Sequence, residues 1–200
     1  MKKLILVFLF LLVANIGMCA LTGSSHDFSS DTRLGSLPCT PCHTPHGGDT
    51  SVSEAPLWNH TLTSTTFTLY STETLNATMA SPDGMSKLCL SCHDGSVKMD
   101  AYGGAGGANT ITGNALIGVD LSGEHPVSFT YNDALATADG GLNAPTTTDS
   151  GLGGKITGDL LSSSKMQCTS CHDVHNGASV AKLLRKSNAN DALCTTCHNK

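Results

Sequence analysis

Aromatic side chains are scarce in this chain, because Phe, Trp and Tyr together make up 4% of its 200 residues. Glycine is plentiful instead, at 21 residues. A chain with so little bulky apolar material is poorly equipped to build a hydrophobic core from side chains alone. The sequence therefore predicts either a loose domain rich in Gly, Ser and Thr or a fold whose interior is completed by something other than polypeptide.

Positive charge is also in short supply. The 11 Lys and Arg residues are outnumbered by 16 Asp and Glu residues, which gives a formal net charge of −5. A nucleic-acid-binding surface needs clustered basic residues. We therefore expect no nucleic acid among the partners of this protein.

Long apolar runs are missing except at the N-terminus, where Lys2 and Lys3 precede an apolar stretch over residues 4–16. This stretch is too short for a comfortable membrane span and has the form of an export signal. We predict a signal peptide over residues 1–20 and a single domain over 21–200. Met18 fits neither cleavage after Ala20 nor lipidation of Cys19, so the processing site stays open. No membrane span is expected after signal removal.

Cysteine, in contrast, is used in a strict pattern. The motif C-x-x-C-H occurs over residues 39–43, 89–93, 168–172 and 194–198, hereafter motifs 1 to 4, and takes up eight of the nine cysteines. This motif is the attachment signature of c-type haem, in which both cysteines form thioethers and the histidine binds iron. The sequence predicts four covalent haems. The predicted attachment residues are Cys39, Cys42, Cys89, Cys92, Cys168, Cys171, Cys194 and Cys197, with His43, His93, His172 and His198 as proximal ligands.

Histidines are numerous enough to supply the opposite face of every iron. The chain has nine, of which five lie outside the four motifs. These candidate distal ligands are His26, His46, His60, His125 and His175. Methionine is the other common distal ligand and raises the reduction potential, but with histidines abundant we prefer none of Met79, Met85, Met99 and Met166. Bis-histidine ligation at low potential is the expectation.

The spacing of His46 and His175 is the most informative, because each follows a proximal histidine by three residues. The axial positions of one iron lie on opposite faces of the ring, so each should reach a neighbouring haem. The alternative is a hydrogen-bond partner to the proximal ligand. His125 precedes the rigid Pro126, which suits a fixed ligand. His60 is the least favoured, and Trp58 beside it is expected to pack against a haem.

The expected fold class is mostly irregular coil with few short helices and short strands, a small multihaem cytochrome c fold organised around four haems. We expect a helix over residues 86–92 that stops at Gly95. A short strand is expected over residues 66–70, with strand character also over 123–131. Loops are expected over 102–118 and 139–158, and a final helix capped by Asn188 or Asn190. Motifs 3 and 4 should be spatial neighbours, and Asp94 and Asp173 should lie at the surface.

These motifs resemble those of exported multihaem cytochromes of metal-reducing bacteria, especially the tetrahaem members that polymerise into extracellular filaments. The segments that carry the resemblance are residues 25–27, 39–46, 55–59, 88–95, 125–129, 168–176 and 193–198. The resemblance implies a continuous chain of bis-histidine haems in alternating parallel and T-shaped pairs. It also implies a homopolymer in which one distal histidine comes from the adjoining subunit, and His26 is the expected donor.

The functional prediction is electron transfer, not catalysis, by an exported protein at the cell surface or in the periplasm. Its expected partners are redox proteins or extracellular acceptors. A monomeric periplasmic shuttle is the first alternative, which sequence cannot separate from a filament subunit. A multihaem oxyanion reductase needs an iron with an open sixth position, which the surplus of histidines argues against. Structural zinc also uses C-x-x-C pairs but does not explain the histidine after each second cysteine.

Overall fold

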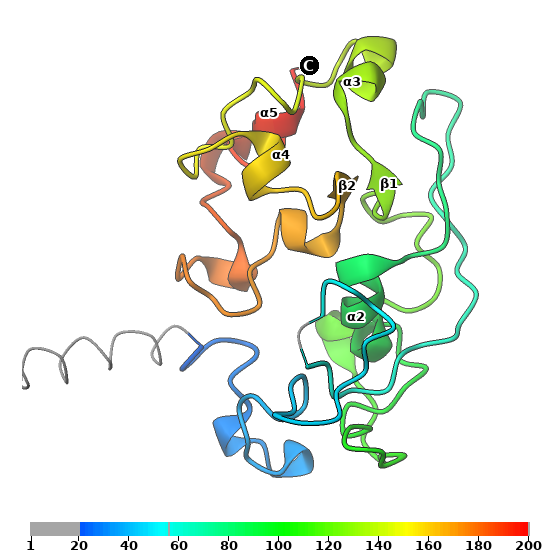
Figure 1. Cartoon of the computed structure of the whole chain (residues 1–200), viewed down its shortest axis with the longest axis vertical. Helices are drawn as coiled ribbons and strands as arrows, with labels where there is room; N and C mark the ends of the chain where they lie inside the picture. Colours follow the sequence, from blue (N-terminus) through cyan, green and yellow to red (C-terminus); the bar gives the residue numbers. More distant parts are fainter. Residues whose placement is uncertain (1–20, 56, 200) are drawn as a thin grey trace, which may run out of the picture.

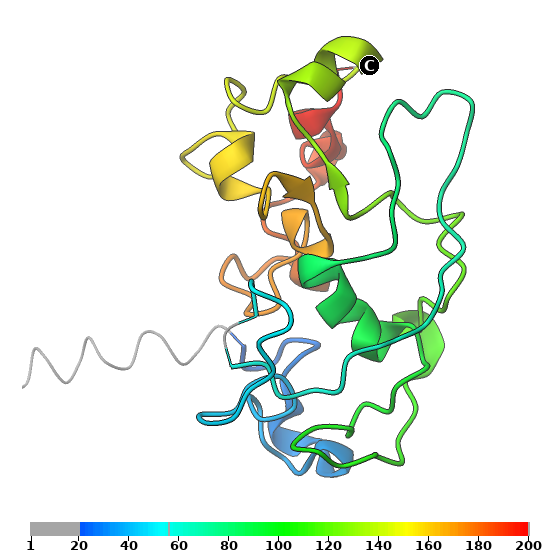
Figure 2. The same ribbon diagram turned by 45° about the vertical axis from the view of Figure 1, so that its right-hand side comes forward.

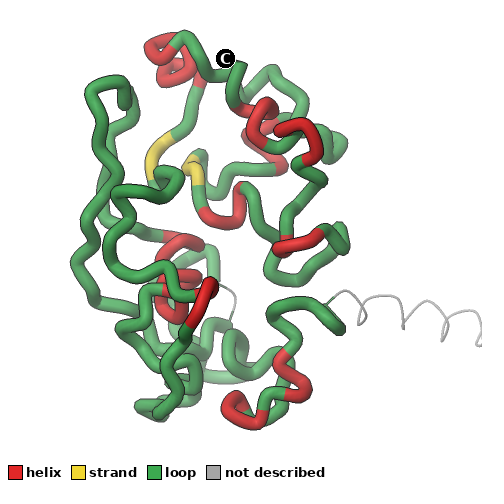
Figure 3. Tube along the Cα trace, turned by 180° about the vertical axis from the view of Figure 1, so that it is seen from behind, coloured by secondary structure: helices red, strands yellow, loops and turns green. Residues whose placement is uncertain are grey.

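Loops dominate the computed structural model, which describes residues 21–55 and 57–199 (Figures 1 and 3). The predicted signal peptide and Cys19 lie outside the described residues. The helices and strands are α2 (Gly84–His93), β1 (Phe129–Thr130), α3 (Asp133–Asp139), α4 (Ile156–Asp159), β2 (Lys165–Met166) and α5 (Cys194–Cys197). Single 3-10 turns are η1 (Phe28–Ser30), η2 (Thr32–Leu34), η3 (Gly113–Ala115), η4 (Cys168–Ser170), η5 (Ala181–Leu183) and η6 (Ala189–Asp191). The predicted class, mostly irregular with short helices and strands, is confirmed.

Helix α2 confirms the helix expected over residues 86–92 and begins two residues earlier. Gly95 ends it as predicted, since its φ of +76° is a left-handed conformation that glycine adopts without strain. A Cβ at Gly95 would lie 2.7 Å from Leu116 Cδ1 and would displace this exposed side chain, so the backbone conformation is the stronger reason for glycine here. At the other end, the side chain of Gln167 accepts the Ser86 N–H at 2.9 Å, which ties α2 to the segment before motif 3.

The sheet consists of β1 and β2, paired antiparallel with Phe129 opposite Met166. The strand character expected over residues 123–131 is thus confirmed at its end. The strand expected over residues 66–70 is wrong, because only Thr68 pairs, in an isolated bridge with Asp120. The partner segment turns away after Leu121, whose carbonyl accepts the Glu124 N–H at 3.1 Å. An alternating pattern of apolar and polar residues does not form a strand unless a second segment of similar length pairs with it.

Buried apolar side chains form two small clusters instead of one core. The upper cluster comprises Phe129, Tyr131, Ala136, Ile156, Leu160, Met166 and Cys197, with Met79 packed against it. The lower cluster comprises Val52, Ala55, Trp58 and Leu88, with Cys42 and Met85 packed against it. Each cluster therefore includes or contacts a cysteine of a haem motif. The core is as limited as the scarcity of aromatic residues predicted.

The expected loops over residues 102–118 and 139–158 are present, interrupted by η3 and by the start of α4. Asn188 precedes η6, and its side chain accepts the Leu193 N–H at 3.0 Å just before α5. Within the described residues no helix has the length and apolar character to cross a membrane.

Candidate haem-binding sites

Each motif folds into one helical turn. The histidine N–H bonds the carbonyl of the first cysteine in motifs 1, 3 and 4, at 2.8, 3.0 and 3.0 Å, and motif 2 is the last part of α2. Residues three apart on such a turn share a face, so both cysteines of a motif point to one side. All eight motif cysteines are free thiols. This is the arrangement that two thioether bonds to one macrocycle require.

Motifs 1, 3 and 4 are held by the same backbone bridge. In each, the carbonyl of the second cysteine accepts an N–H from a distant segment, and the residue after the histidine donates back to that segment. The first set of bonds joins Asn59 to Cys42 (2.9 Å), Arg185 to Cys171 (2.9 Å) and Asn143 to Cys197 (2.8 Å). The return bonds join Thr44 to Leu57 (2.9 Å), Asp173 to Leu183 (2.7 Å) and Asn199 to Gly141 (3.0 Å).

The residue that donates its N–H also donates from its side chain to the spacer between the two cysteines. Asn59 Nδ2 bonds the Thr40 carbonyl at 2.6 Å, and Asn143 Nδ2 bonds the Thr196 carbonyl at 3.0 Å. Arg185 Nη1 bonds the Thr169 carbonyl at 3.3 Å. We call Asn59, Asn143 and Arg185 the clamp residues. Sequence reasoning missed them because they lie at irregular distances from their motifs and carry no local signal.

Ring orientation is fixed through Nδ1 at several histidines. His93 Nδ1 lies 2.7 Å from the Ala115 carbonyl, and His172 Nδ1 lies 3.0 Å from the Lys182 carbonyl. His125 Nδ1 lies 2.9 Å from the Pro126 carbonyl. A carbonyl accepts only the Nδ1–H tautomer, which leaves the lone pair of Nε2 available to a metal. The three rings are thus prepared to bind iron through the same atom.

Histidine rings meet in three pairs. The pairs are His43 with His175 at 6.2 Å between ring centroids, His26 with His93 at 6.0 Å, and His125 with His198 at 6.3 Å. Each pair joins one histidine of a C-x-x-C-H motif to one histidine from outside the motifs.

These separations suit an iron between the rings. A metal–imidazole bond is about 2 Å long, and with the ring centroid about 1 Å further out, two imidazoles on opposite faces of one iron lie about 6 Å apart. Direct aromatic contacts cover a similar range, so distance alone does not identify a ligand pair. The composition of the pairs does distinguish iron ligands from chance ring contacts. Chance contacts would not be expected to combine a motif histidine with a histidine from outside the motifs in all three pairs.

A cavity of about 490 Å³ adjoins the His125–His198 pair and Cys197. Its apolar lining includes Leu75, Phe129, Tyr131, Leu135, Leu142 and Met166. Ligand sites for flat apolar molecules are commonly of this size and character. Cavity, thiol and paired imidazoles together fit a haem at motif 4.

The surroundings of Trp58 also indicate that a non-protein group forms part of the interior. Its side chain is buried in the lower cluster beside Cys42, and its Nε1–H has no hydrogen-bond acceptor among the described residues. A buried donor without an acceptor is unusual in a folded protein. The arrangement agrees with a non-protein group near motif 1.

The ninth histidine lies in different surroundings from the other eight. His60 is buried, and its Nδ1 and Nε2 lie 2.8 Å and 3.0 Å from the carbonyls of Thr61 and Lys98. Nε2 is also 3.3 Å from Cys92 Sγ. A neutral imidazole donates to only one of these carbonyls, and that His60 binds iron stays the least favoured of the ligand predictions.

His26 faces His93 of its own chain, and its expected contribution to an adjoining subunit stays a prediction. Burial and the positive charges of His93, His175 and His172 together lower the pKa of His26 to about 4. The ring is therefore neutral at pH 7, the form that binds metals.

His46 and His172 are both exposed, and within the described chain neither ring is paired with another. The structure therefore brings together six of the nine histidines that the motifs and the spare set offer for iron, and leaves His46, His172 and His60 outside the ring pairs.

The cysteines of successive motifs are neighbours, which places the motifs in sequence order. Burial and the charge of Cys42 together raise the pKa of the Cys92 thiol to about 12, which links motifs 1 and 2. Cys89 and Cys168 interact across motifs 2 and 3, and the interaction lowers the pKa of Cys168 to about 7. Burial and then the charge of Cys194 raise the pKa of Cys171, which links motifs 3 and 4 as their spacing predicted.

The prediction that Asp94 lies at the surface is wrong. Its side chain is 4% exposed, and Thr63 Oγ1 and the Ser96 N–H donate to its carboxylate at 2.6 and 2.7 Å. The hydroxyl and amide donors at the end of α2 satisfy the buried charge. Asp173, which follows His172 in the same way, is half-buried and accepts the N–H groups of His175 and Gly177.

The comparison with protein families agrees with this geometry. A family model described as the doubled CXXCH motif matches residues 163–200, which contain motifs 3 and 4. No curated protein matches the chain. The match and the sites together support a multihaem c-type cytochrome, a class that carries covalent haem and transfers electrons.

Proposed function

We propose that this protein transfers electrons through four covalently attached, bis-histidine c-type haems. The observation that carries the proposal is the set of three imidazole pairs, each made of one motif histidine and one spare histidine. When bound, each haem supplies a one-electron iron couple. The polypeptide holds the thioether cysteines, fixes the imidazoles and covers the ring faces with its two apolar clusters.

The ring pairs assign ligands to three irons, and the remaining two histidines are assigned to the fourth. The proposed pairs are His43 with His175, His93 with His26, His198 with His125, and His172 with His46. Two imidazoles favour a lower potential than an imidazole and a thioether. The contacts between cysteines of successive motifs support an electron path in the order 1, 2, 3, 4.

We further propose that His46 reaches the iron of motif 3 in an adjoining copy, so that the protein acts as a filament subunit in extracellular electron transport. Both His46 and His172 are exposed, and neither ring is paired with another in the part of the chain that the structure describes, which supports this assignment. Export is supported by the charged start and apolar run of the first 20 residues. The partners would be redox proteins or extracellular acceptors.

The haem proposal is tested on the purified protein by absorption spectroscopy and intact mass. We expect a red protein whose mass exceeds that of the processed chain by four haems, with low-spin spectra. Carbon monoxide added to the reduced, assembled protein should leave the spectrum unchanged, because bis-histidine irons have no open position. A colourless preparation, or a mass equal to that of the bare chain, would contradict the proposal.

The filament proposal is tested by electron microscopy of the wild type and of His46→Ala. We expect filaments from the wild type only, and one carbon monoxide-binding haem per chain in the variant. Monodisperse wild-type protein with all haems closed to carbon monoxide would favour the monomeric shuttle instead.

A further inference from the structure

The residue that follows the clamp of motif 3 contacts motif 4. Arg185 holds motif 3 through its backbone N–H and its Nη1. The next residue, Lys186, donates from Nζ to Thr196 Oγ1, which lies in the spacer between the two cysteines of motif 4. The Cα atoms of adjacent residues are only about 3.8 Å apart. Two neighbouring side chains thus reach the spacers of two successive motifs.

The same arrangement occurs between motifs 1 and 2. Asn59 holds motif 1 through its N–H and its Nδ2. The next residue, His60, is buried, and its Nε2 lies 3.3 Å from the sulfur of Cys92, the second cysteine of motif 2. The third clamp residue, Asn143, is followed by Ala144, whose side chain has no polar group. The arrangement therefore joins motif 1 to motif 2 and motif 3 to motif 4.

Lys186 is itself fixed from a second side. Its Nζ also donates to the carbonyl of Ser150 at 2.6 Å. Ser150 is fully buried, and its hydroxyl donates to the carboxylate of Asp159 in α4. The same carboxylate accepts the Gly154 N–H at 2.8 Å, which closes the loop around it. The amine of Lys186 therefore joins the spacer of motif 4 to a loop that is already tied to a helix.

Thr196 is held through both its backbone and its side chain. Its carbonyl accepts from Asn143 Nδ2 at 3.0 Å, and its hydroxyl accepts from Lys186 and donates to the Ala192 carbonyl at 2.9 Å. The residue is 7% exposed, so water does not replace these partners. The clamp thus fixes motif 4 to its own loop, whereas Lys186 fixes it relative to motif 3.

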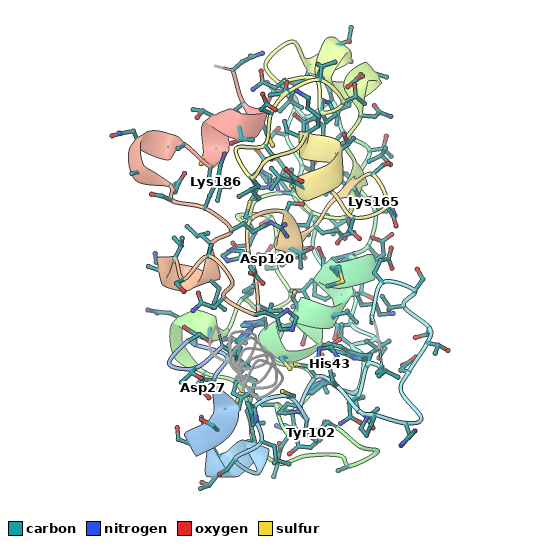
Figure 4. The ribbon with its side chains drawn as sticks, turned by 60° about the vertical axis from the view of Figure 1, so that its left-hand side comes forward. Asp27, His43, Tyr102, Asp120, Lys165 and Lys186 are labelled. Carbon is teal, nitrogen blue, oxygen red and sulfur yellow. The ribbon has the colours of Figure 1, made fainter. Side chains whose placement is uncertain are left out.

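The two contacts lie in different parts of the molecule. In Figure 4, Lys186 lies in the upper half, whereas His43 of motif 1 lies in the lower half. Between them, motif 2 and motif 3 are joined by separate contacts, since the Cys168 N–H donates to Ser86 Oγ at 3.0 Å and Gln167 accepts the Ser86 N–H. Each step of the proposed electron path therefore has its own set of side-chain contacts.

We propose that Asn59-His60 and Arg185-Lys186 are bridging dipeptides, which set the separation and relative orientation of the haems at motifs 1 and 2 and at motifs 3 and 4. A haem attached through two cysteines follows the turn that carries them. Electron transfer between two haems slows steeply as they move apart, so these four residues are positioning residues for the path. The inference rests on the proposed haem attachment.

The test is circular dichroism of the full holoprotein in the Soret region. Haems that lie close together give paired positive and negative bands, whose size depends on their separation and relative orientation. Lys186→Met removes the amine and keeps an unbranched side chain, and we expect it to lose part of the paired signal. Intact mass should still show four haems, and the reduced protein should bind no more carbon monoxide than the wild type, because cysteines and iron ligands are untouched.

His60→Phe tests the other bridging dipeptide, because it keeps a ring and removes both nitrogens. We expect a change of the paired bands here too, again with four haems closed to carbon monoxide. The two changes should add in the double variant with Lys186→Met, since they act on different haem pairs. In contrast, Thr196→Val removes the acceptor of Lys186, so it should change the bands alone but add little to Lys186→Met.

Two controls separate positioning from general effects. Lys186→Arg keeps a donor and should keep the wild-type bands. Lys155→Met removes the same charge from an exposed ion pair with Asp149, next to the loop that Lys186 contacts, and should also keep them. If Lys186→Met does not accumulate, Thr196→Val reports on the same contact.

Unchanged bands in either variant would overturn the inference for its haem pair, as would an equally large change in Lys155→Met. A haem that binds carbon monoxide in His60→Phe would also overturn it at motifs 1 and 2, because His60 would then be an iron ligand. Failure of the haem proposal itself would look different, since the wild type would then have no Soret absorption.

Discussion

At the residue scale, the nine histidines divide into three groups by their surroundings. Six form the ring pairs, His46 and His172 lie outside them, and His60 is buried between backbone carbonyls. Counting histidines against motifs predicted nine candidate ligands, but not which of them would lie in pairs. The fate of His60 could not be predicted, because the carbonyls of Thr61 and Lys98 converge on it only after residues 38 positions apart have folded together.

Removal of a distal ligand should open one iron. In His175→Ala, the iron proposed to lie opposite His43 loses its sixth ligand, while all attachment cysteines remain. We expect one haem per chain to become high-spin and to bind carbon monoxide after reduction, with an unchanged haem-to-protein ratio. Carbon monoxide difference spectroscopy measures this. Four closed haems in the variant would contradict the ligand pair.

His60→Ala provides the contrasting case. Its loss removes one ring N–H donor and leaves a cavity at a buried site, while the Lys98 carbonyl keeps the Ala101 N–H as a donor, so we expect a cost of about 1–3 kcal/mol. We expect a lower denaturation midpoint and no carbon monoxide binding beyond that of the wild type. An opened iron in this variant would identify His60 as a ligand.

Acid should act on His26 in a predictable direction. Its folded pKa of about 4 lies below the ordinary 6.5, so the unfolded chain binds more protons between these values. This contribution to stability is complete above about pH 6.5 and is lost as pH falls towards 4. We expect His26→Gln to flatten the pH dependence of the denaturation midpoint in that window. An equally steep dependence in the variant would contradict the assignment.

At the scale of elements, the junction between α2 and η4 joins motif 2 to motif 3. Gln167 is buried there, and its side chain accepts from Ser86 N and Ser128 Oγ at 2.9 and 3.2 Å and donates to Asp83 at 3.1 Å. Figure 2 shows α2 and the segment of η4 close together, as Figure 1 does. Helix α2 itself was predictable from its residues and Gly95. The junction was not, because a glutamine gives no sign of a partner 81 positions away.

Gln167→Leu should weaken this junction. Several polar groups would be left buried without partners, at about 1–3 kcal/mol each, so the free energy of unfolding should fall by at least about 2 kcal/mol. Chemical denaturation of the holoprotein measures the change. Asn114→Leu, at an exposed amide in η3, serves as the control and should cost little. Equal midpoints in the two variants would show that the junction contributes no more than a surface amide.

At the scale of the whole molecule, the described chain is elongated, and its motif-bearing elements follow one another along the long axis from the lower loops through α2 and η4 to α5 (Figure 1). Two small apolar clusters in place of one core make the chain depend on its cofactors. The shortage of aromatic residues predicted that dependence. The division of the buried apolar residues into two clusters could not be predicted, because it depends on where distant loops lie in the folded chain.

Loss of one attachment cysteine should therefore affect more than one site. We expect Cys171→Ser to reduce accumulation of the entire protein, because cofactor binding and chain ordering are coupled. Thr169→Ser, in the same spacer, should accumulate as the wild type does. Haem-stained gels and immunoblots measure both. Wild-type yield of Cys171→Ser would argue that the polypeptide orders itself independently.

The interaction between the Cys89 and Cys168 thiols has a consequence for how the protein is made. Thiols that lie this close in the folded chain would oxidise to a bridge in any compartment that favours disulfides. Such a bridge would disable two attachment motifs at once. We therefore expect haem attachment at these two motifs to precede closure of the chain around them.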